Sequence, residues 1–242
     1  MGCARSNARW FRRATICDSV IADPTGRCAV DCLEFSGLIA SRLCHDLAGP
    51  IGVLANGAEL LADETDEAVR AEFVALIGAG ATTLAARLRL LRTLFADGSD
   101  LAIPQAAART VLAGWLAADA RVTLEWRETD ATLARPFVRL LLALAMIAAE
   151  ALERGGLVTV HCAPEGWQID ATGPDAALAT EEAEILGGAA ASVIGSRAAI
   201  AHLAAALVRK LAIELTVVEH VGEVQFRLLE RAGAERAHDM LP

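Results

Sequence analysis

Two long helical patterns separated by a short polar turn limit the fold of this chain more than any other feature. The first runs from Glu34 to about Asp63 and the second from about Glu67 to Phe95, with apolar residues at intervals of three and four. Each helix is about 40 Å long at about 1.5 Å per residue, and the turn is short enough to make them an antiparallel hairpin. Because two helices alone cannot bury both apolar faces, a second copy is expected to complete a four-helix bundle.

The second half of the chain mixes helices and strands. Sequence periodicity predicts helices at 105–118, 136–153 and 197–210, and strands at 121–127, 157–163, 166–172, 212–220 and 223–230. This order favours a mostly antiparallel sheet covered by helices on one face. The chain therefore divides into a helical hairpin at 34–98 and an α+β domain at 104–230. We expect residues 1–33 to be a disordered extension and residues 231–242 a flexible tail.

Charge and hydropathy exclude several partners. The net charge is −9, whereas nucleic-acid and anionic-membrane binding needs a basic footprint, so we expect neither partner. The longest uncharged apolar run, Leu140–Ala149, is about half of the roughly 20 residues that a membrane span needs. The basic N-terminus lacks the long apolar stretch of a secretory signal. With abundant alanine and arginine, typical of high-GC bacterial genes, these features predict a cytoplasmic bacterial protein.

The cysteines form no recognisable metal site. No CxxC pair and no nearby histidine accompanies the six of them, which are Cys3, Cys17, Cys28, Cys32, Cys44 and Cys162. We interpret them as reduced thiols, and we expect the protein to hold no metal of its own.

The stretch SRLCHDLAGPIGVLANGAELL, residues 41–61, divides into two faces when it is drawn as a helical wheel. The face around His45 contains Ser41, Arg42, Gly49, Gly52, Asn56 and Glu59. The opposite face contains Ala40, Leu43, Leu47, Pro50, Leu54, Ala58 and Leu61. The wheel therefore predicts that His45 projects from the polar face, where its imidazole can meet a partner, with Asp46 flanking it.

Several neighbours of His45 suggest a functional reason for this exposure. Gly49 and Gly52 each cost about 1 kcal/mol in a helix interior, and they would clear room for a bulky partner. Pro50 has no N–H, so it bends the helix and leaves the carbonyl of Asp46 free. Arg42 would place a positive charge where an anion could sit, and Asp46 could orient the imidazole or accept its proton.

Two other uses of His45 fit less well. Cys44 and His45 point about 100° apart on a helix, which disfavours a Cys–His nucleophile pair. A metal site lacks further ligands one turn away, since Gly49 occupies the position where the HExxH motif has its second histidine.

The sequence HDLAGP in a long helix, followed by a helical hairpin, resembles the phospho-accepting H-box of two-component histidine kinases. The fuller stretch, Arg-x-x-His-Asp-x-x-x-Pro with Asn56-Gly57 downstream, resembles the ChpT family of histidine phosphotransferases. The similarity extends from about Phe35 to Glu230. It implies an α+β fold, in which a two-helix hairpin forms a dimeric four-helix bundle and is followed by a degenerate Bergerat-type, histidine-kinase ATPase-like α/β sandwich.

The second half resembles the ATP-binding domain of histidine kinases without its nucleotide boxes. Ala148 and Ala149 lie near the place of the magnesium-binding asparagine, and Ala171 takes the place of the adenine-reading aspartate. Gly173 is kept, but Asp175 replaces the next glycine, and Gly195 alone remains of the glycine-rich phosphate loop. Such a loop presents bare backbone N–H groups to phosphates. We therefore expect no cofactor-binding residues.

The resemblance implies a phosphorelay. His45 would take a phosphoryl group from the receiver domain of a hybrid histidine kinase and pass it to the aspartates of response-regulator receiver domains, CtrA-like and CpdR-like by family resemblance. The receiver would supply Mg²⁺. His45 and Asp46 would be the catalytic residues. The supporting phosphotransfer face would consist of Arg42, Gly49, Pro50, Gly52 and Asn56.

Other interpretations remain open at this point. The protein could be an active histidine kinase with divergent nucleotide boxes, or a non-catalytic dimeric adaptor that only binds receivers. Leu38, Val53 and Leu60 lie on or beside the His45 face, as docking contacts or as packing against the second domain.

Overall fold

The computed structural model of the 242-residue chain describes residues 32–95, 102–118, 120–127, 131–188, 195 and 197–230. The predicted extension and tail lie outside the described residues, except for Cys32 and Leu33 at the start of the first helix. Cys44 is a free, exposed thiol, whereas Cys162 is disulfide-bonded. The interpretation of all six cysteines as reduced thiols is therefore wrong for Cys162.

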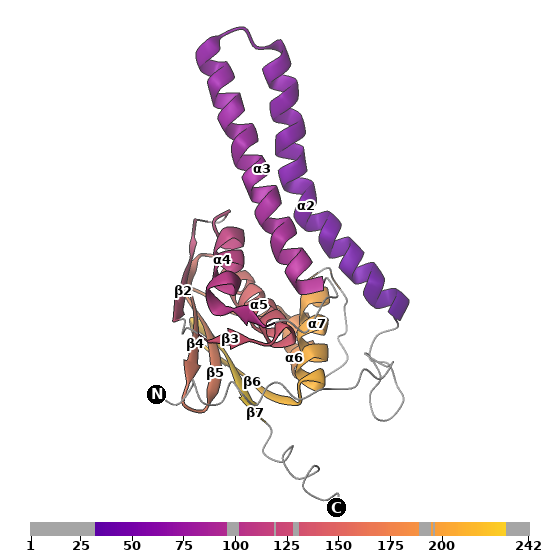
Figure 1. Cartoon of the computed structure of the whole chain (residues 1–242), viewed down its shortest axis with the longest axis vertical. Coiled ribbons are helices and arrows are strands. Elements are labelled where there is room, and N and C mark those ends of the chain that lie inside the picture. Colours follow the sequence, from indigo (N-terminus) through magenta and orange to yellow (C-terminus); the bar gives the residue numbers. More distant parts are fainter. Residues whose placement is uncertain are drawn as a thin grey trace, which may run out of the picture.

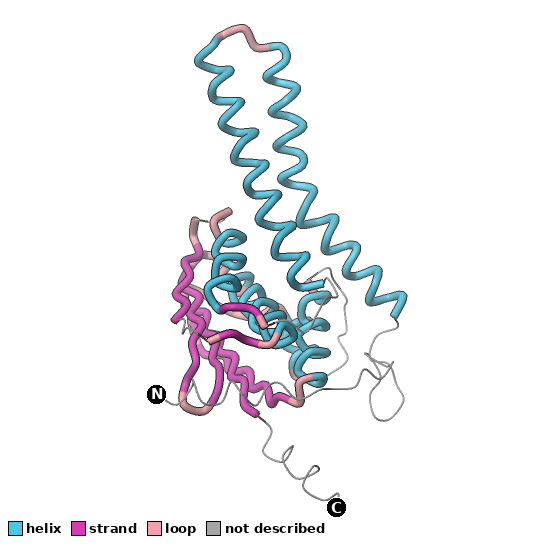
Figure 2. The backbone as a smooth tube through the Cα atoms, in the orientation of Figure 1, coloured by secondary structure: helices cyan, strands magenta, loops and turns pink. Residues whose placement is uncertain are grey.

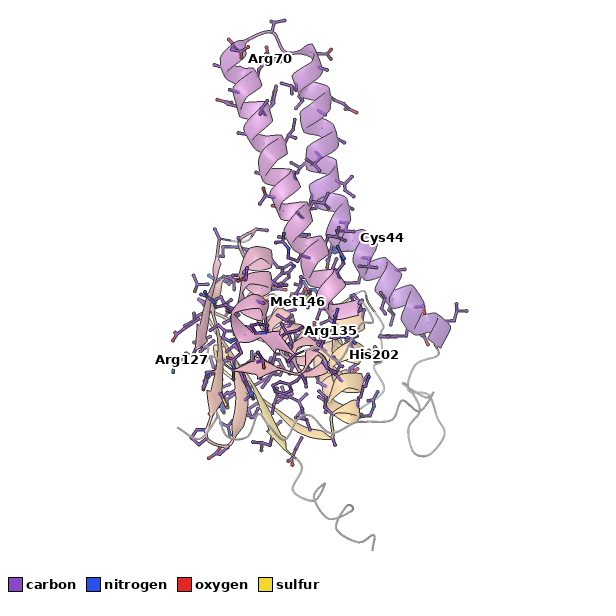
Figure 3. The ribbon with its side chains drawn as sticks, viewed as in Figure 1. Cys44, Arg70, Arg127, Arg135, Met146 and His202 are labelled. Carbon is purple, nitrogen blue, oxygen red and sulfur yellow. The ribbon has the colours of Figure 1, made fainter. Side chains whose placement is uncertain are left out.

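Helix α2 (Cys32–Asp63) and helix α3 (Glu67–Phe95) form the predicted hairpin, which stands out from the rest of the molecule (Figure 1). Side-chain hydrogen bonds stabilise the turn between the two helices. Asp66 accepts hydrogen bonds from the N–H groups of Ala68 and Val69 and so caps the start of α3. Arg70, labelled at the tip in Figure 3, donates to the carbonyls of Leu61 and Glu64 at the end of α2. These contacts make the turn short and the two helices antiparallel.

The hairpin packs closely in its middle and opens toward its base. A side chain at Gly80 would press against Val53 and Leu54, and one at Gly57 would come within 2.8 Å of Ile77, so both glycines allow close approach of the helices. Below this region α2 bends away from α3 (Figure 1). Pro50 is buried inside α2, and its missing N–H and its ring account for a bend.

Much of the apolar surface of the hairpin has no partner among the described residues of one chain. Large exposed side chains are Ile51, Val53, Leu60, Val74, Leu76 and Leu88. By length and composition alone, α2 and α3 are long and apolar enough to cross a membrane, although the sequence was expected to contain no span. Only 17% and 22% of these two stretches is buried. The hairpin therefore presents two largely uncovered apolar faces.

The remaining elements form one α/β domain. Its helices are α4 (Gln105–Leu116), α5 (Arg135–Glu150), α6 (Thr180–Leu186) and α7 (Ala198–Lys210). Its main strands are β2 (Val122–Arg127), β4 (Gly156–Ala163), β5 (Gly166–Thr172), β6 (Ile213–His220) and β7 (Glu223–Glu230). Two short strands that the sequence did not predict, β1 (Ile103–Pro104) and β3 (Thr132–Leu133), pair with each other.

The five main strands have the order β2-β4-β5-β7-β6. The β2–β4 pair is parallel and the other three pairs are antiparallel, so the predicted, mostly antiparallel sheet is confirmed. Helices cover one face of the sheet (Figure 2): α4 contacts β2, α5 contacts β4, β5 and β7, and α7 contacts β6.

Helix α5 is the centre of the core. Every residue from Leu140 to Ala148 is fully buried, including Met146, which lies in the interior in Figure 3. Phe137 packs edge-on against Trp167 of β5, with ring centroids 5.8 Å apart. On its other side α5 contacts α3, α4 and α7. The base of the hairpin is thus attached to the same helix that fills the core of the α/β domain.

Candidate functional site

His45 lies on α2 with 75% of its side chain exposed, which confirms the orientation that the helical wheel predicts. Its neighbour Cys44 marks this level in Figure 3, at the base of the hairpin beside the α/β domain. The Nδ1 atom of His45 is 3.2 Å from Oδ1 of Asp46. When Nδ1 carries the proton and donates it to this carboxylate, Nε2 keeps a free lone pair on the exposed side of the ring.

Asp46 is buried, unlike the histidine that it contacts. Its side chain is 8% exposed, and its Oδ2 accepts a hydrogen bond of 2.8 Å from Nε of Arg42, one helical turn earlier. The carboxylate therefore joins the exposed imidazole on one side to a buried guanidinium on the other.

The expectation that Arg42 presents its charge to an incoming anion is wrong. The side chain is 5% exposed, and both of its terminal nitrogens donate to the carboxylate of Glu150, the last residue of α5. Burial by itself would lower the pKa of Arg42, but the hydrogen bonds and charges of Glu150 and Asp46 outweigh it and raise the pKa further above its usual range. The wheel failed because it places residues on one helix only, whereas the partner of Arg42 lies 108 residues away.

Pro50 has the predicted consequence for its own helix. Without an N–H at position 50, the carbonyl of Asp46 lacks its helical donor. Nη1 of Arg87 on α3 takes that place, with a hydrogen bond of 2.6 Å to this oxygen. Sequence reasoning missed Arg87 and Glu150: the free carbonyl signalled that some donor was needed, but nothing in the pattern identified which one. We call Arg42, Asp46, Arg87 and Glu150 the Asp46 cluster.

The surface next to His45 is open. Cβ atoms added at Gly49 or Gly52 would meet nothing within 4 Å, and Asn56 is exposed. Packing among the described residues therefore gives no reason for these two glycines, in contrast to Gly57 and Gly80. Gly49 and Gly52 leave an open strip, without side chains, on the face of α2 that carries His45.

A second buried acid lies near the Asp46 cluster. Glu182 on α6 is 1% exposed; its Oε2 accepts a hydrogen bond from the N–H of Ala179, and in the described part of the chain its Oε1 has no partner. Burial, and then the negative charge of Glu150, raise the pKa of Glu182 to about 7.

In the region that resembles a phosphate loop, the structure describes Gly195 and the start of α7. Residues 189–194 and 196 lie outside the described residues. The N–H of Gly195 donates to Oε2 of Glu181 at 2.9 Å, and α7 begins with the buried Ala198 and Ala199. The backbone N–H of Gly195, which is the kind of group that binds phosphate, is therefore already hydrogen-bonded to a carboxylate.

The other nucleotide positions are apolar. Ala171 is fully buried on β5, between Val158 of β4 and Val224 of β7. Ala148 and Ala149 are buried in α5. A side chain at Gly173 would come within 2.4 Å of the carbonyl oxygen of Gly155, so packing alone explains this retained glycine. Among the described residues, no group of three or more His, Cys, Asp or Glu side chains could hold a metal ion.

Comparison with known proteins finds similarity to histidine phosphotransferases. The family described as "Histidine phosphotransferase C-terminal domain" matches residues 105–222. The protein phosphotransferase ChpT of Brucella abortus (strain 2308) is 31% identical over 132 residues, which cover 53% of this chain and 61% of that protein. The aligned part is therefore less than two thirds of the relative's length.

One solved structure supports the fold. A structure titled "1.7 Angstrom Structure of a Bacterial Phosphotransferase" matches with a TM-score of 0.71 and 24% identity, over 82% of this chain and 97% of the other. The histidine kinase AdeS of Acinetobacter baumannii covers 78% of this chain and 98% of its own, with a TM-score of 0.39 and 15% identity. The fold is a helical hairpin followed by an α/β domain, as in the solved phosphotransferase, and the chain is similar to histidine phosphotransferases, ChpT of Brucella abortus among them.

Proposed function

We propose that this protein is a phosphorelay histidine phosphotransferase and that His45 carries the phosphoryl group. The observation that supports this most is the pairing of an exposed imidazole with a buried carboxylate at Nδ1. When the proton of the neutral ring is on Nδ1, Nε2 has the free lone pair that a nucleophile needs. The donor is the receiver domain of a hybrid histidine kinase, and the acceptors are receiver domains of response regulators, CtrA-like and CpdR-like by family resemblance.

The chemistry needs only positioning and charge neutralisation from this chain. Nε2 of His45 attacks the phosphorus of the receiver's aspartyl phosphate, an N–P bond forms, and the acyl-phosphate O–P bond breaks to release the aspartate carboxylate. The ring then carries positive charge, which the carboxylate of Asp46 stabilises at Nδ1. The second transfer is the reverse reaction, onto the aspartate of the next receiver. Mg²⁺ is supplied by the receiver domains.

The open strip at Gly49 and Gly52 suits the close approach of a receiver domain, and Asn56 lies further along the same face. Val53 and Leu60 are exposed beside this strip and are proposed docking contacts. The other exposed apolar side chains of the hairpin, such as Leu76 and Leu88, suit a second copy of the chain. We therefore propose a homodimer with a four-helix bundle, in the bacterial cytoplasm and without nucleic-acid or membrane partners. The nucleotide positions, which are buried, apolar or occupied by carboxylates, favour a carrier without kinase or ATPase activity.

Transfer of labelled phosphate tests this function. A receiver domain phosphorylated with ³²P is incubated with the protein, and acid-labile, base-stable label on the protein is measured. We expect labelling of the wild type and none of His45→Gln, because little packing is lost when an exposed side chain is replaced. The matched control is His220→Gln, which changes another exposed histidine and should label normally. Full labelling of His45→Gln would remove His45 from the mechanism, and an unlabelled but receiver-binding wild type would favour the adaptor.

A further inference from the structure

Glu150 is the only carboxylate of α5, and it ends the helix directly after the buried, apolar stretch Leu140–Ala149. Its two oxygens accept hydrogen bonds from the two terminal nitrogens of Arg42, one of them at 3.3 Å. The third nitrogen of Arg42, Nε, bonds Asp46 at 2.8 Å. All three nitrogens of this guanidinium are therefore engaged, and one carboxylate from each domain shares it.

The side chains of Arg42, Asp46 and Glu150 are largely shielded from water, so their mutual positions affect stability strongly. Arg42, Asp46 and Glu150 have side chains that are 5%, 8% and 15% exposed. An Arg–Asp pair one turn apart on an exposed helix is weak and mobile. A buried one that is clamped from a second element is held in a single arrangement, and the loss of one partner leaves a buried charge uncompensated.

Asp46 is held at its main chain as well. Arg87 of α3 bonds the carbonyl oxygen that Pro50 leaves without a helical donor. The side chain of Asp46 is thus tied to α5 through Arg42, while its backbone is tied to α3. The other carboxylate oxygen, Oδ1, lies 3.2 Å from Nδ1 of His45 and can accept a hydrogen bond from it.

We propose that Glu150 and Arg87 are positioning residues for the phosphoacceptor, which they orient through Asp46. On this proposal, which rests on the proposed function of His45, Glu150 keeps Arg42 from moving and Arg42 keeps the Asp46 carboxylate at Nδ1. The consequence is a fixed tautomer, with the proton on Nδ1 and the lone pair on Nε2. The ATPase-like domain thereby contributes a functional part of the site on the hairpin.

A purely structural role would lead to a different expectation. The hairpin and the domain also meet elsewhere, for example where Phe35 of α2 packs edge-on against His202 of α7 with ring centroids 6.4 Å apart. A simple attachment between domains needs no connection to the acid that contacts His45. The Arg42–Glu150 pair has that connection, so its removal should change the imidazole itself as well as the stability of the fold.

The test compares Glu150→Gln and Arg87→Met with the matched controls Glu153→Gln and Arg89→Met, all in the full chain. Glu153 and Arg89 are exposed residues of the same types, close by in the sequence. Three quantities are measured: the initial rate of phosphoryl transfer from a labelled receiver, the ¹⁵N chemical shifts of the His45 ring nitrogens at neutral pH, and the thermal unfolding midpoint. We expect both test variants to slow transfer about tenfold, the usual size of coupling within one hydrogen-bond network, and to shift the ring signals toward a mixture of tautomers. The controls should change neither.

A double variant tests the route. In an Arg42→Met background, Glu150→Gln should cause no further change in the ring shifts or the rate, because Glu150 acts through Arg42. Unchanged ring shifts in a folded Glu150→Gln protein would overturn the proposal, whether or not transfer slows, since slower transfer alone would mean a direct contact with the receiver. The ring shifts need no phosphoryl transfer, so a failure of the proposed function, seen as an unlabelled wild type, is distinguishable from a failure of this inference.

Discussion

Nη1 of Arg87 on α3 lies 2.6 Å from the carbonyl oxygen of Asp46 on α2, the one carbonyl that Pro50 deprives of its helical partner. A helix breaker and its compensating donor thus come from different helices of the hairpin. The bend that results is a fixed feature, because the vacated acceptor is satisfied by a partly buried arginine.

Supplying the missing N–H should therefore disturb the site. In Pro50→Ala the new amide competes with Arg87 for the Asp46 carbonyl and straightens α2, so we expect higher helix content by circular dichroism and slower phosphoryl transfer to His45. Pro164→Ala, in the exposed turn between β4 and β5, is the control and should change neither. Equal transfer rates in Pro50→Ala and the wild type would show that the bend is irrelevant to the chemistry.

The glycines of α2 should respond in opposite ways to the same substitution. Gly49→Ala adds a methyl group in open space and should raise the free energy of unfolding by up to about 1 kcal/mol, the difference in helix propensity. Gly57→Ala forces Ile77 to move, so we expect no gain or a loss. Chemical denaturation measures both changes.

If a receiver domain binds at the open strip around Gly49 and Gly52, a larger side chain there should slow phosphoryl transfer without changing stability. We expect Gly49→Leu to remain as stable as the wild type and to accept label more slowly from a phosphorylated receiver. Normal transfer by a folded Gly49→Leu protein would contradict a partner at this strip.

The uncovered hairpin faces predict an obligate dimer. Leu88 is 44% exposed in one chain and Leu84 is half-buried, and dimers of this kind are stabilised by about 25 cal/mol for each Å² of apolar surface buried. Replacing both leucines with glutamate should give a monomer or aggregate in light scattering. Val221→Glu, at a fully exposed turn between β6 and β7, should leave the dimer intact. A stable, folded monomer of the wild type would count against the bundle.

The stability of the protein should fall as pH rises through neutrality because of Glu182. Its pKa is raised from about 4.5 to about 7 by burial and by Glu150. Between these values the folded state binds more protons than the unfolded state, so the free energy of unfolding decreases from about pH 4.5 to about pH 7, by at most about 3 kcal/mol. Glu182→Gln should lose this slope and be more stable than the wild type at pH 8. Glu165→Gln, an exposed acid, should keep it, and a Glu182→Gln protein with the wild-type slope would assign the effect to another group.

We expect no binding of nucleotide. Calorimetry with Mg-ATP should give no heat up to millimolar concentration, since the adenine position is the buried Ala171 and the N–H of Gly195 is already bound by Glu181. Each lost hydrogen bond to a charged group weakens binding by about 1.5–3 kcal/mol, and each 1.4 kcal/mol is about tenfold in affinity. A micromolar dissociation constant would make the active-kinase interpretation the better one.

The sequence predicted most of the architecture because it depends on local patterns. Periodicity located both hairpin helices, and alternation located the five main strands, whereas β1 and β3, two residues each, are too short to give a pattern. The exposure of His45 and the vacant carbonyl of Asp46 also follow from a single helix. Arg42 was misplaced for the complementary reason: its burial depends on Glu150, and a wheel of α2 contains no information about α5.

The close packing of α5 also determines where harmful mutations should occur. Glu150 ends a helix whose residues from Leu140 to Ala148 are completely enclosed, so any change that moves this helix along its axis also moves the carboxylate that holds Arg42. Interiors this tightly filled adjust by shifting whole elements. If the protein acts in a phosphorelay as proposed, a genetic screen for loss of signalling is expected to recover alleles at apolar positions of α5, away from the His45 face, in proteins that still fold.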